Sequence, residues 1–150
     1  MKTIKQSVII GFIVIMLSSC SSLYDHFTYT ETIKTKLDAI SLIDKSDTPY
    51  DDSEVQITNL KNQMEKMVIY EKGKAKNELT QKMWQLISSD KNLMGSYLKL
   101  WEEKGSLNPA FKEEAKPQIE EAFNLMIFYE EKKDRKAQNA LAEFINQFKL

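Results

Sequence analysis

The sequence predicts an all-α protein: a compact bundle of about five to six amphipathic helices that follows a cleaved signal peptide. Apolar residues recur at intervals of three and four along most of the chain, which is the spacing of one helix face. Glycine and proline are scarce, with four and three residues, whereas many strands and tight turns would need more. The single cysteine excludes an internal disulfide, so packing must stabilise the domain.

The first residues have the parts of a secretory signal. Lys2 and Lys5 give a positive start, and residues 8–17 form an apolar run that only Gly11 interrupts. This run is shorter than the roughly 20 apolar residues of a comfortable membrane-spanning helix. The run ends in small residues and a cysteine: Leu17, Ser18, Ser19 and Cys20.

These four residues resemble the lipobox of bacterial lipoproteins, in which a small-residue pair precedes a modified cysteine. The resemblance implies cleavage before Cys20, attachment of diacylglycerol to it, and acylation of the new amino terminus by a chain such as palmitate. The chain then divides into a signal peptide at 1–19, a lipidated tether at 20–27 and a single helical domain at 28–150. Two alternatives stay open: an incidental thiol near an ordinary cleavage site, and an uncleaved anchor over residues 7–23.

The lipid predicts where the protein resides. Each buried methylene contributes about 0.8 kcal/mol, so two or more acyl chains hold a protein stably on a bilayer. Ser21 follows the cysteine, where inner-membrane lipoproteins of Gram-negative cells often carry aspartate. We therefore expect the bacterial cell membrane, and in a Gram-negative cell the outer membrane, facing the periplasm.

Capping signals place the first two helices. Thr28 and Glu31 have capping-box spacing, which predicts a helix from Thr28 to about Lys45. The acidic residues Asp51, Asp52 and Glu54 favour the start of a second helix, because they suit its positive end. A heptad-like apolar seam then runs towards Gly73 and indicates one wall of a bundle.

Two shorter helices are expected in the middle of the chain. Asn77 can cap a third helix, and Asp90 is the expected cap of a fourth. Gly105 suits the left-handed position that ends this fourth helix. The two apolar stripes include Trp84, Tyr97 and Trp101. These aromatic residues indicate either a groove for a ligand or partner, or simply the core.

The last part of the chain predicts a long helix and a short one. Asn108 and Pro109 form a start signal, a cap followed by proline at the first helical position. Pro117 lies inside the following apolar pattern, where it either kinks one helix or begins another. After a charged joint at 130–133, Asp134 is the expected cap of the last helix.

Three aromatic residues follow the cysteine closely: Tyr24, Phe27 and Tyr29. Amphipathic rings are favoured at the interface between membrane and water. Packing beneath the first helix is the alternative, because aromatic rings also bury much apolar area.

Several segments carry a resemblance to a known group. Residues 92–101 (NLMGSYLKLW) and 105–111 (GSLNPAF) are followed by EEAK at 113–116 and EAF at 121–123. Together with the lipobox, they resemble a group of small helical bacterial lipoproteins of unassigned function. The resemblance covers most of the mature chain and implies no activity.

Residues that carry chemistry are sparse. His26 is the only histidine and lies in the expected tether, whereas metal sites need several converging ligands. Neighbouring acids such as Glu130 and Glu131 point in different directions on a helix, so a solvated surface is expected. A serine elbow and a glycine-rich phosphate loop are also missing from the sequence. We therefore predict no catalytic residue, no metal and no cofactor besides the lipid.

The net charge of the chain limits the classes of partner that it can bind. Without residues 1–19 the chain has 19 basic and 22 acidic residues, a net charge of −3 with His neutral. Arg135 is the only arginine, so nucleic acid is not expected as a partner. The leading hypothesis is an interaction or scaffold module that binds an envelope protein. The alternative is a carrier or sensor of a small apolar ligand, and an enzyme acting on envelope material ranks third.

The lipobox hypothesis predicts that Cys20→Ala abolishes lipidation. The variant should incorporate no labelled palmitate and should keep residues 1–19, because the cysteine is both the acylated residue and the cleavage position. Metabolic labelling and intact-mass measurement check this, with Ser21→Ala as the matched small-residue control. Continued labelling of Cys20→Ala would contradict the hypothesis.

Overall fold

The computed structural model describes residues 24–148, so the signal peptide, the lipobox and Cys20 lie outside the described residues. The described chain is all-helical, with six α-helices and one short 3-10 helix, as the sequence predicts. The elements in chain order are α2 (His26–Lys45), η1 (Tyr50–Ser53), α3 (Glu54–Lys72), α4 (Glu78–Ser88), α5 (Leu93–Lys104), α6 (Pro109–Lys132) and α7 (Arg135–Ile145).

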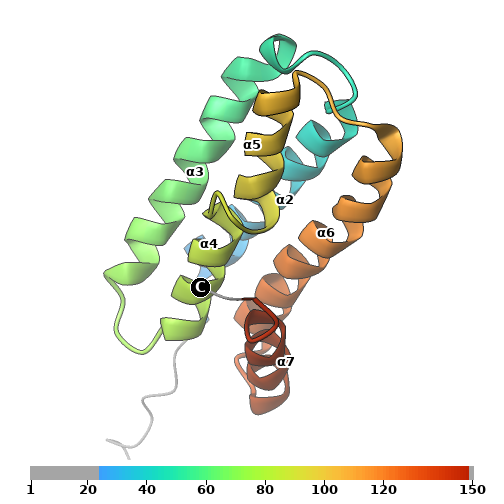
Figure 1. The fold of residues 1–150 in the computed structure, drawn as a ribbon. Coiled ribbons are helices and arrows are strands. Elements are labelled where there is room, and N and C mark those ends of the chain that lie inside the picture. Colours follow the sequence, from blue (N-terminus) through green and yellow to red (C-terminus); the bar gives the residue numbers. More distant parts are fainter. Residues whose placement is uncertain (1–23, 149–150) are drawn as a thin grey trace, which may run out of the picture.

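The helices form an up-and-down bundle (Figure 1). α2, α3 and α6 each run along the length of the bundle, while α4 and α5 follow one another along its remaining side. α7 packs against α6 and α4. No helix within residues 24–148 has the length and apolarity to cross a bilayer.

Ion pairs between the long helices define the two ends of the bundle. Lys66 of α3 pairs with Glu31 of α2 at 2.8 Å, whereas Lys116 of α6 pairs with Asp44 of α2 at 2.5 Å. Both α3 and α6 therefore run antiparallel to α2. We call the end made by residues 24–31, 66–78 and 129–138 the tether end, because α2 begins there, and the opposite end the distal end.

α2 begins two residues earlier than the sequence suggests. Asp25 Oδ1 accepts the backbone N–H groups of Phe27 and Thr28 at 2.9 and 3.2 Å, so Asp25 is the cap. The predicted capping box is wrong because Thr28 is buried and donates its hydroxyl to Glu71 instead. His26 consequently lies in the first helical turn and not in the expected tether.

Other capping predictions have mixed outcomes. Asn108 and Asp134 cap α6 and α7 by accepting N–H groups at 2.8 Å, as expected. Asp90 is not the cap of α5, which follows Asn92. Gly105 ends α5 with a φ of +75°, in the region that favours glycine.

α6 continues through Pro117 as one helix of 24 residues. Proline removes the amide that would bond to the carbonyl of Glu113. Both residues are exposed, so water can satisfy this carbonyl. The alternative in which Pro117 begins a new helix is therefore wrong.

The apolar stripes of the helices meet in one core. Its largest wholly buried side chains include Trp84, Trp101, Phe123, Ile43, Ile57, Leu60, Met64, Met67, Met83 and Met94. Gly95 lets α5 approach the end of α4, since a Cβ there would collide with the carbonyl oxygens of Ser88 and Ser89. The absence of a side chain thus fixes the joint between α4 and α5.

Gly95→Ala should therefore destabilise the fold by about 1–3 kcal/mol, the usual range for overpacking. Urea unfolding followed by tryptophan fluorescence measures the free energy of unfolding. Gly73→Ala is the matched control, because its Cβ would lie at an ordinary 3.4 Å from the carbonyl oxygen of Tyr70. Equal stabilities of the two variants would contradict this account of the joint.

Candidate functional site

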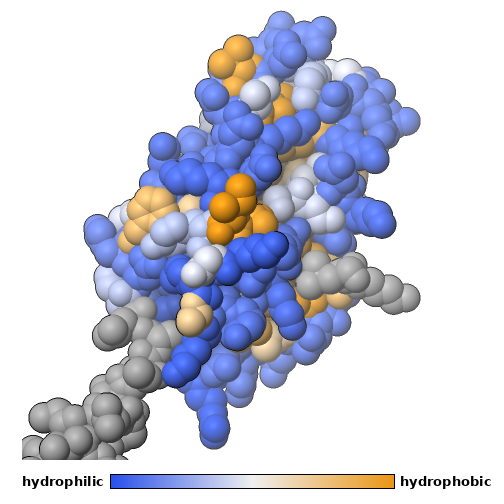
Figure 2. Space-filling model, turned by 90° about the vertical axis from the view of Figure 1, so that its left-hand side faces the viewer, coloured by the Kyte–Doolittle hydropathy of each residue, from blue (hydrophilic) through white to orange (hydrophobic). Residues whose placement is uncertain are grey.

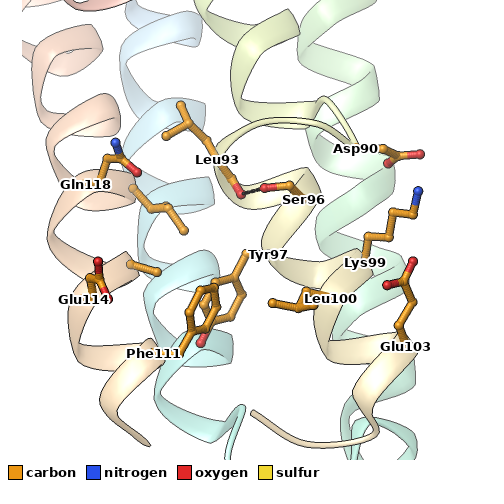
Figure 3. A pocket seen from close by; sticks show the side chains of 12 residues that line it. Asp90, Leu93, Ser96, Tyr97, Lys99, Leu100, Glu103, Phe111, Glu114 and Gln118 are labelled. Carbon is orange, nitrogen blue, oxygen red and sulfur yellow. Dashed lines mark hydrogen bonds between the residues drawn. The ribbon is translucent and has the colours of Figure 1, made fainter. Parts of the chain in front are cut away.

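A groove of about 500 Å³ runs between α5 and the first half of α6 (Figure 3). We call it the α5–α6 groove. The rings of Tyr97 and Phe111 stack in it, with centroids 5.7 Å apart and planes 15° from parallel. Apolar side chains of both helices complete the lining: Leu93, Leu100, Ala115 and Ile119. The groove therefore combines an aromatic stack with aliphatic walls.

The fold holds Tyr97 rigidly. Its ring lines the groove, while its hydroxyl lies 2.5 Å from the buried Ser46 Oγ. Ser46 Oγ also donates to the carbonyl of Ile43 at 2.8 Å. Burial raises the pKa of the Tyr97 hydroxyl. Tyr97 is only 2% exposed, so its ring forms an inner wall of the groove against Phe111, and its polar tip is satisfied inside the bundle.

Charged side chains surround the groove, and most are acidic. Asp90, Glu103 and Glu114 contribute three carboxylates, and Lys99 contributes one ammonium group. Figure 3 shows Glu114 on the α6 side and Lys99 with Glu103 on the α5 side. The rim therefore favours a ligand that carries positive charge.

The sequence indicates Trp84, Tyr97 and Trp101 as candidate lining residues of a groove, and of these only Tyr97 lines the α5–α6 groove. Trp84 and Trp101 are wholly buried. The ring of Trp84 meets Phe123 edge to face at 6.2 Å, and Trp101 Nε1 donates to the carbonyl of Thr48 at 3.1 Å. The groove interpretation is corrected for both tryptophans, because their stripe faces inward and makes them core residues.

The aromatic residues near the start of α2 stay partly outside the core. Tyr24 and Phe27 are exposed, and Tyr29 is half-buried. Phe27 packs on Tyr70 of α3 with ring centroids 4.6 Å apart, and Tyr24 packs on Tyr29 at 5.7 Å. The sequence missed Tyr70, which joins this group only through the pairing of α2 with α3.

Two glutamates at the tether end are wholly buried, which the sequence analysis did not predict. Glu71 accepts hydrogen bonds from Thr28 Oγ1 and Asn77 Nδ2. Glu130 accepts one from Thr80 Oγ1 at 2.8 Å. The expectation of a solvated surface is therefore wrong for Glu130.

Each buried carboxylate has a lysine three residues later. Lys74 Nζ lies 3.2 Å from Glu71, and Lys133 Nζ lies 2.7 Å from Glu130 in an ion pair. The sequence does contain a signal for these two buried positions. Glu71 lies four residues after Met67, and Glu130 lies four residues after Met126, so each glutamate shares a helix face with an apolar methionine.

Burial raises the pKa of Glu71, although its bond from Thr28 and the charge of Lys74 oppose the shift. Asp25 behaves oppositely. Partial burial disfavours its charge, but bonds from Lys74 and from the Thr28 N–H prevail and lower its pKa from 3.8 to about 2. Lys74 Nζ lies 2.6 Å from Asp25 and thereby links the two carboxylates.

Within residues 24–148, no group of three or more His, Cys, Asp or Glu side chains is arranged to hold a metal ion. Comparison of the chain with protein-family models, with curated proteins and with solved structures finds no match in any of the three. The geometry of the described residues is therefore the basis for any functional proposal.

The lowered pKa of Asp25 predicts a pH-dependent contribution to stability. Because the folded state lowers this pKa, the contribution is complete above the unfolded value of 3.8 and is lost as the pH falls towards about 2. Asp25→Asn keeps a cap residue but removes the charge, so it should cost about 1–2 kcal/mol near neutral pH. The deficit relative to wild type should shrink between pH values of about 4 and 2.

Urea unfolding at several pH values measures this deficit, with Asp38→Asn on the exposed face of α2 as the control. A deficit of constant size down to the lowest pH would contradict the assigned role of Asp25.

Proposed function

We propose that this protein is a membrane-anchored envelope lipoprotein whose helical domain is an interaction module, binding a protein partner in the α5–α6 groove. The supporting observation is the exposed ring of Phe111, which stacks on the buried Tyr97 within a groove on the distal half of the bundle. Phe111 is 38% exposed, whereas the other large aromatic residues of α5 and α6 lie inside or partly inside the bundle. An exposed aromatic anchor in a groove is a common centre of protein interfaces.

The position of the groove suits a tethered protein. Lys112 and Lys116 of α6 pair with Asp47 and Asp44 near the end of α2, at 3.1 and 2.5 Å. The groove half of α6 therefore lies far along the bundle from the start of α2. A partner can approach it without contacting the surface to which Cys20 would be anchored.

The chemistry of the groove suits a basic amphipathic helix. Its aromatic and aliphatic walls accept apolar side chains spaced three and four residues apart. The three carboxylates of the rim, Asp90, Glu103 and Glu114, attract lysine or arginine side chains that flank such an apolar face.

A carrier of a small apolar ligand is the second candidate. The groove volume of about 500 Å³ falls within the usual range of roughly 300–1,000 Å³ for small-molecule sites. However, Trp84 and Trp101, two of the three aromatic residues that indicated a ligand groove, fill the core. The charged rim also suits a polypeptide better than a wholly apolar molecule.

A photoreactive phenylalanine analogue at position 111 tests the groove in the full chain on its native membrane. We expect a specific protein adduct at 111, because this position is at the aromatic centre of the groove. The matched control is the same analogue at Leu37, which is 63% exposed on α2 outside the groove. Equal adducts at both positions, or none at 111, would contradict the proposal.

Charge reversal tests the chemistry of the partner. Glu114→Lys should weaken the adduct, with the difference largest at low ionic strength, because rim charges act mainly through long-range attraction. Glu121→Lys makes the same change on an exposed position of α6 outside the groove and should leave the adduct unchanged. A stronger adduct in Glu114→Lys would contradict a basic partner.

A further inference from the structure

Exposed apolar side chains concentrate at the tether end. Of the seven large hydrophobic residues that are exposed, Tyr24, Phe27, Ile69 and Tyr70 belong to this end. Figure 2 looks onto the α3 side, where apolar residues stand out against a mostly hydrophilic surface. The contact between Phe27 and Tyr70 joins the start of α2 to the end of α3. We call these four residues the tether-end patch.

Lysines accompany this patch. Lys66 Nζ lies 5.1 Å from the centre of the Phe27 ring, and Lys74 Nζ lies 5.2 Å from that of Tyr70. Lys72 and Lys76 are exposed where α3 ends. Basic side chains therefore surround the aromatic residues, as at surfaces that meet anionic headgroups.

The acidic residues near the patch are largely neutralised. Asp25 pairs with Lys74 at 2.6 Å, and Glu31 pairs with Lys66 at 2.8 Å. Glu71 and Glu130 are wholly buried and pair with Lys74 and Lys133, which offset their negative charge. The lysines of these pairs are neutralised as well, so the exposed Lys72 and Lys76 supply the positive charge beside the patch.

Charge is segregated along the whole bundle. The tether end has eight Lys and Arg residues and seven Asp and Glu residues, whereas the rest of the described chain has 10 and 15. The protein therefore has a net charge of +1 at the tether end and −5 elsewhere. Such a distribution orients a protein with its tether end towards an anionic surface.

The short segment between Cys20 and the described domain also favours an orientation with the tether end towards the membrane. Three residues lie between Cys20 and Tyr24, and four steps of an extended chain, each of at most about 3.6 Å, span about 14 Å. If Cys20 is lipidated, Tyr24, two residues before α2 begins, stays within about this distance of the headgroups.

We propose that the tether-end patch, with Lys66, Lys72 and Lys76, docks on the anionic phospholipid surface of the membrane. This inference rests on the lipid anchor of the proposed function and adds an orientation to it. The aromatic residues insert at the interface, the lysines contact lipid phosphates, and the α5–α6 groove faces away from the bilayer.

Position-specific fluorescence on membranes tests the docking. Full-length protein with Ile69→Cys, purified in its lipidated form, carries an environment-sensitive fluorophore at residue 69. It is reconstituted into vesicles of phosphatidylcholine and phosphatidylglycerol with brominated acyl chains. We expect bromine quenching at position 69, because the proposed docking places it among the lipids.

Val55→Cys is the matched control. Both residues are branched aliphatic side chains on α3, exposed to 65% at Ile69 and 72% at Val55, but Val55 lies at the distal end. We expect no quenching at 55. Equal quenching at both positions, or none at 69 on vesicle-bound protein, would overturn the docking proposal.

Lysine neutralisation tests the chemistry of the surface. Each of Lys72→Gln and Lys76→Gln should lower the ratio of docked to undocked domains about fivefold, the factor equivalent to about 1 kcal/mol per lysine at an anionic surface. Lys45→Gln with Lys104→Gln, both exposed outside the tether end, is the control and should leave the ratio unchanged. Unchanged quenching at 69 in the Lys72 and Lys76 variants would overturn the role of the lysines.

The vesicle experiment also distinguishes a failure of the docking proposal from a failure of the lipid anchor. A thiol label that reacts with Cys20 in the purified protein, together with loss of protein from the vesicles, would overturn both the anchor and the docking. Protein that stays on the vesicles through its lipid but shows no quenching at 69 would overturn the docking alone.

Discussion

Two carboxylates without access to water close the tether end of the bundle, and the arrangement of the helices there depends on their partners. Removing a carboxylate from water costs several kcal/mol unless ion pairs and hydrogen bonds replace the lost hydration. Glu71 on α3 is satisfied by Thr28 of α2 and by Asn77 just before α4. Glu130 on α6 is satisfied by Thr80 of α4. The two groups therefore tie α2, α3, α4 and α6 together at one end.

The lysines complete this constraint and connect it to the surface. Lys74 joins buried Glu71 to Asp25, the residue that caps α2. Asp25 also accepts a hydrogen bond from Tyr70 at 3.1 Å, and Tyr70 packs on Phe27. Because one chain of contacts runs from the buried carboxylate to the exposed aromatic residues, the first turn of α2 is part of the domain.

The two ends of the bundle consequently have different chemistry. The tether end combines buried carboxylates, exposed aromatic residues and lysines, whereas the distal half has the acidic groove between α5 and α6. The core between them separates a surface suited to anionic lipid from one suited to a basic partner. This polarity supports the proposed orientation, in which the tether end meets a membrane and the groove binds a second protein.

The sequence by itself determined the helical class and most helix boundaries, because these follow from local spacing and capping. Asn108, Asp134 and Gly105 act on their own helices, so they were predictable. Only the tertiary structure decided which polar residues are buried and which aromatic residues line a groove. Glu71 and Trp84 occupy stripe positions whose surroundings come from other helices. Asp25 rather than Thr28 caps α2 because Glu71, far along the chain, takes the Thr28 hydroxyl. Contacts between helices that are distant in the sequence decide which residues are buried and which residue caps α2. The local spacing of apolar residues carries no information about these contacts.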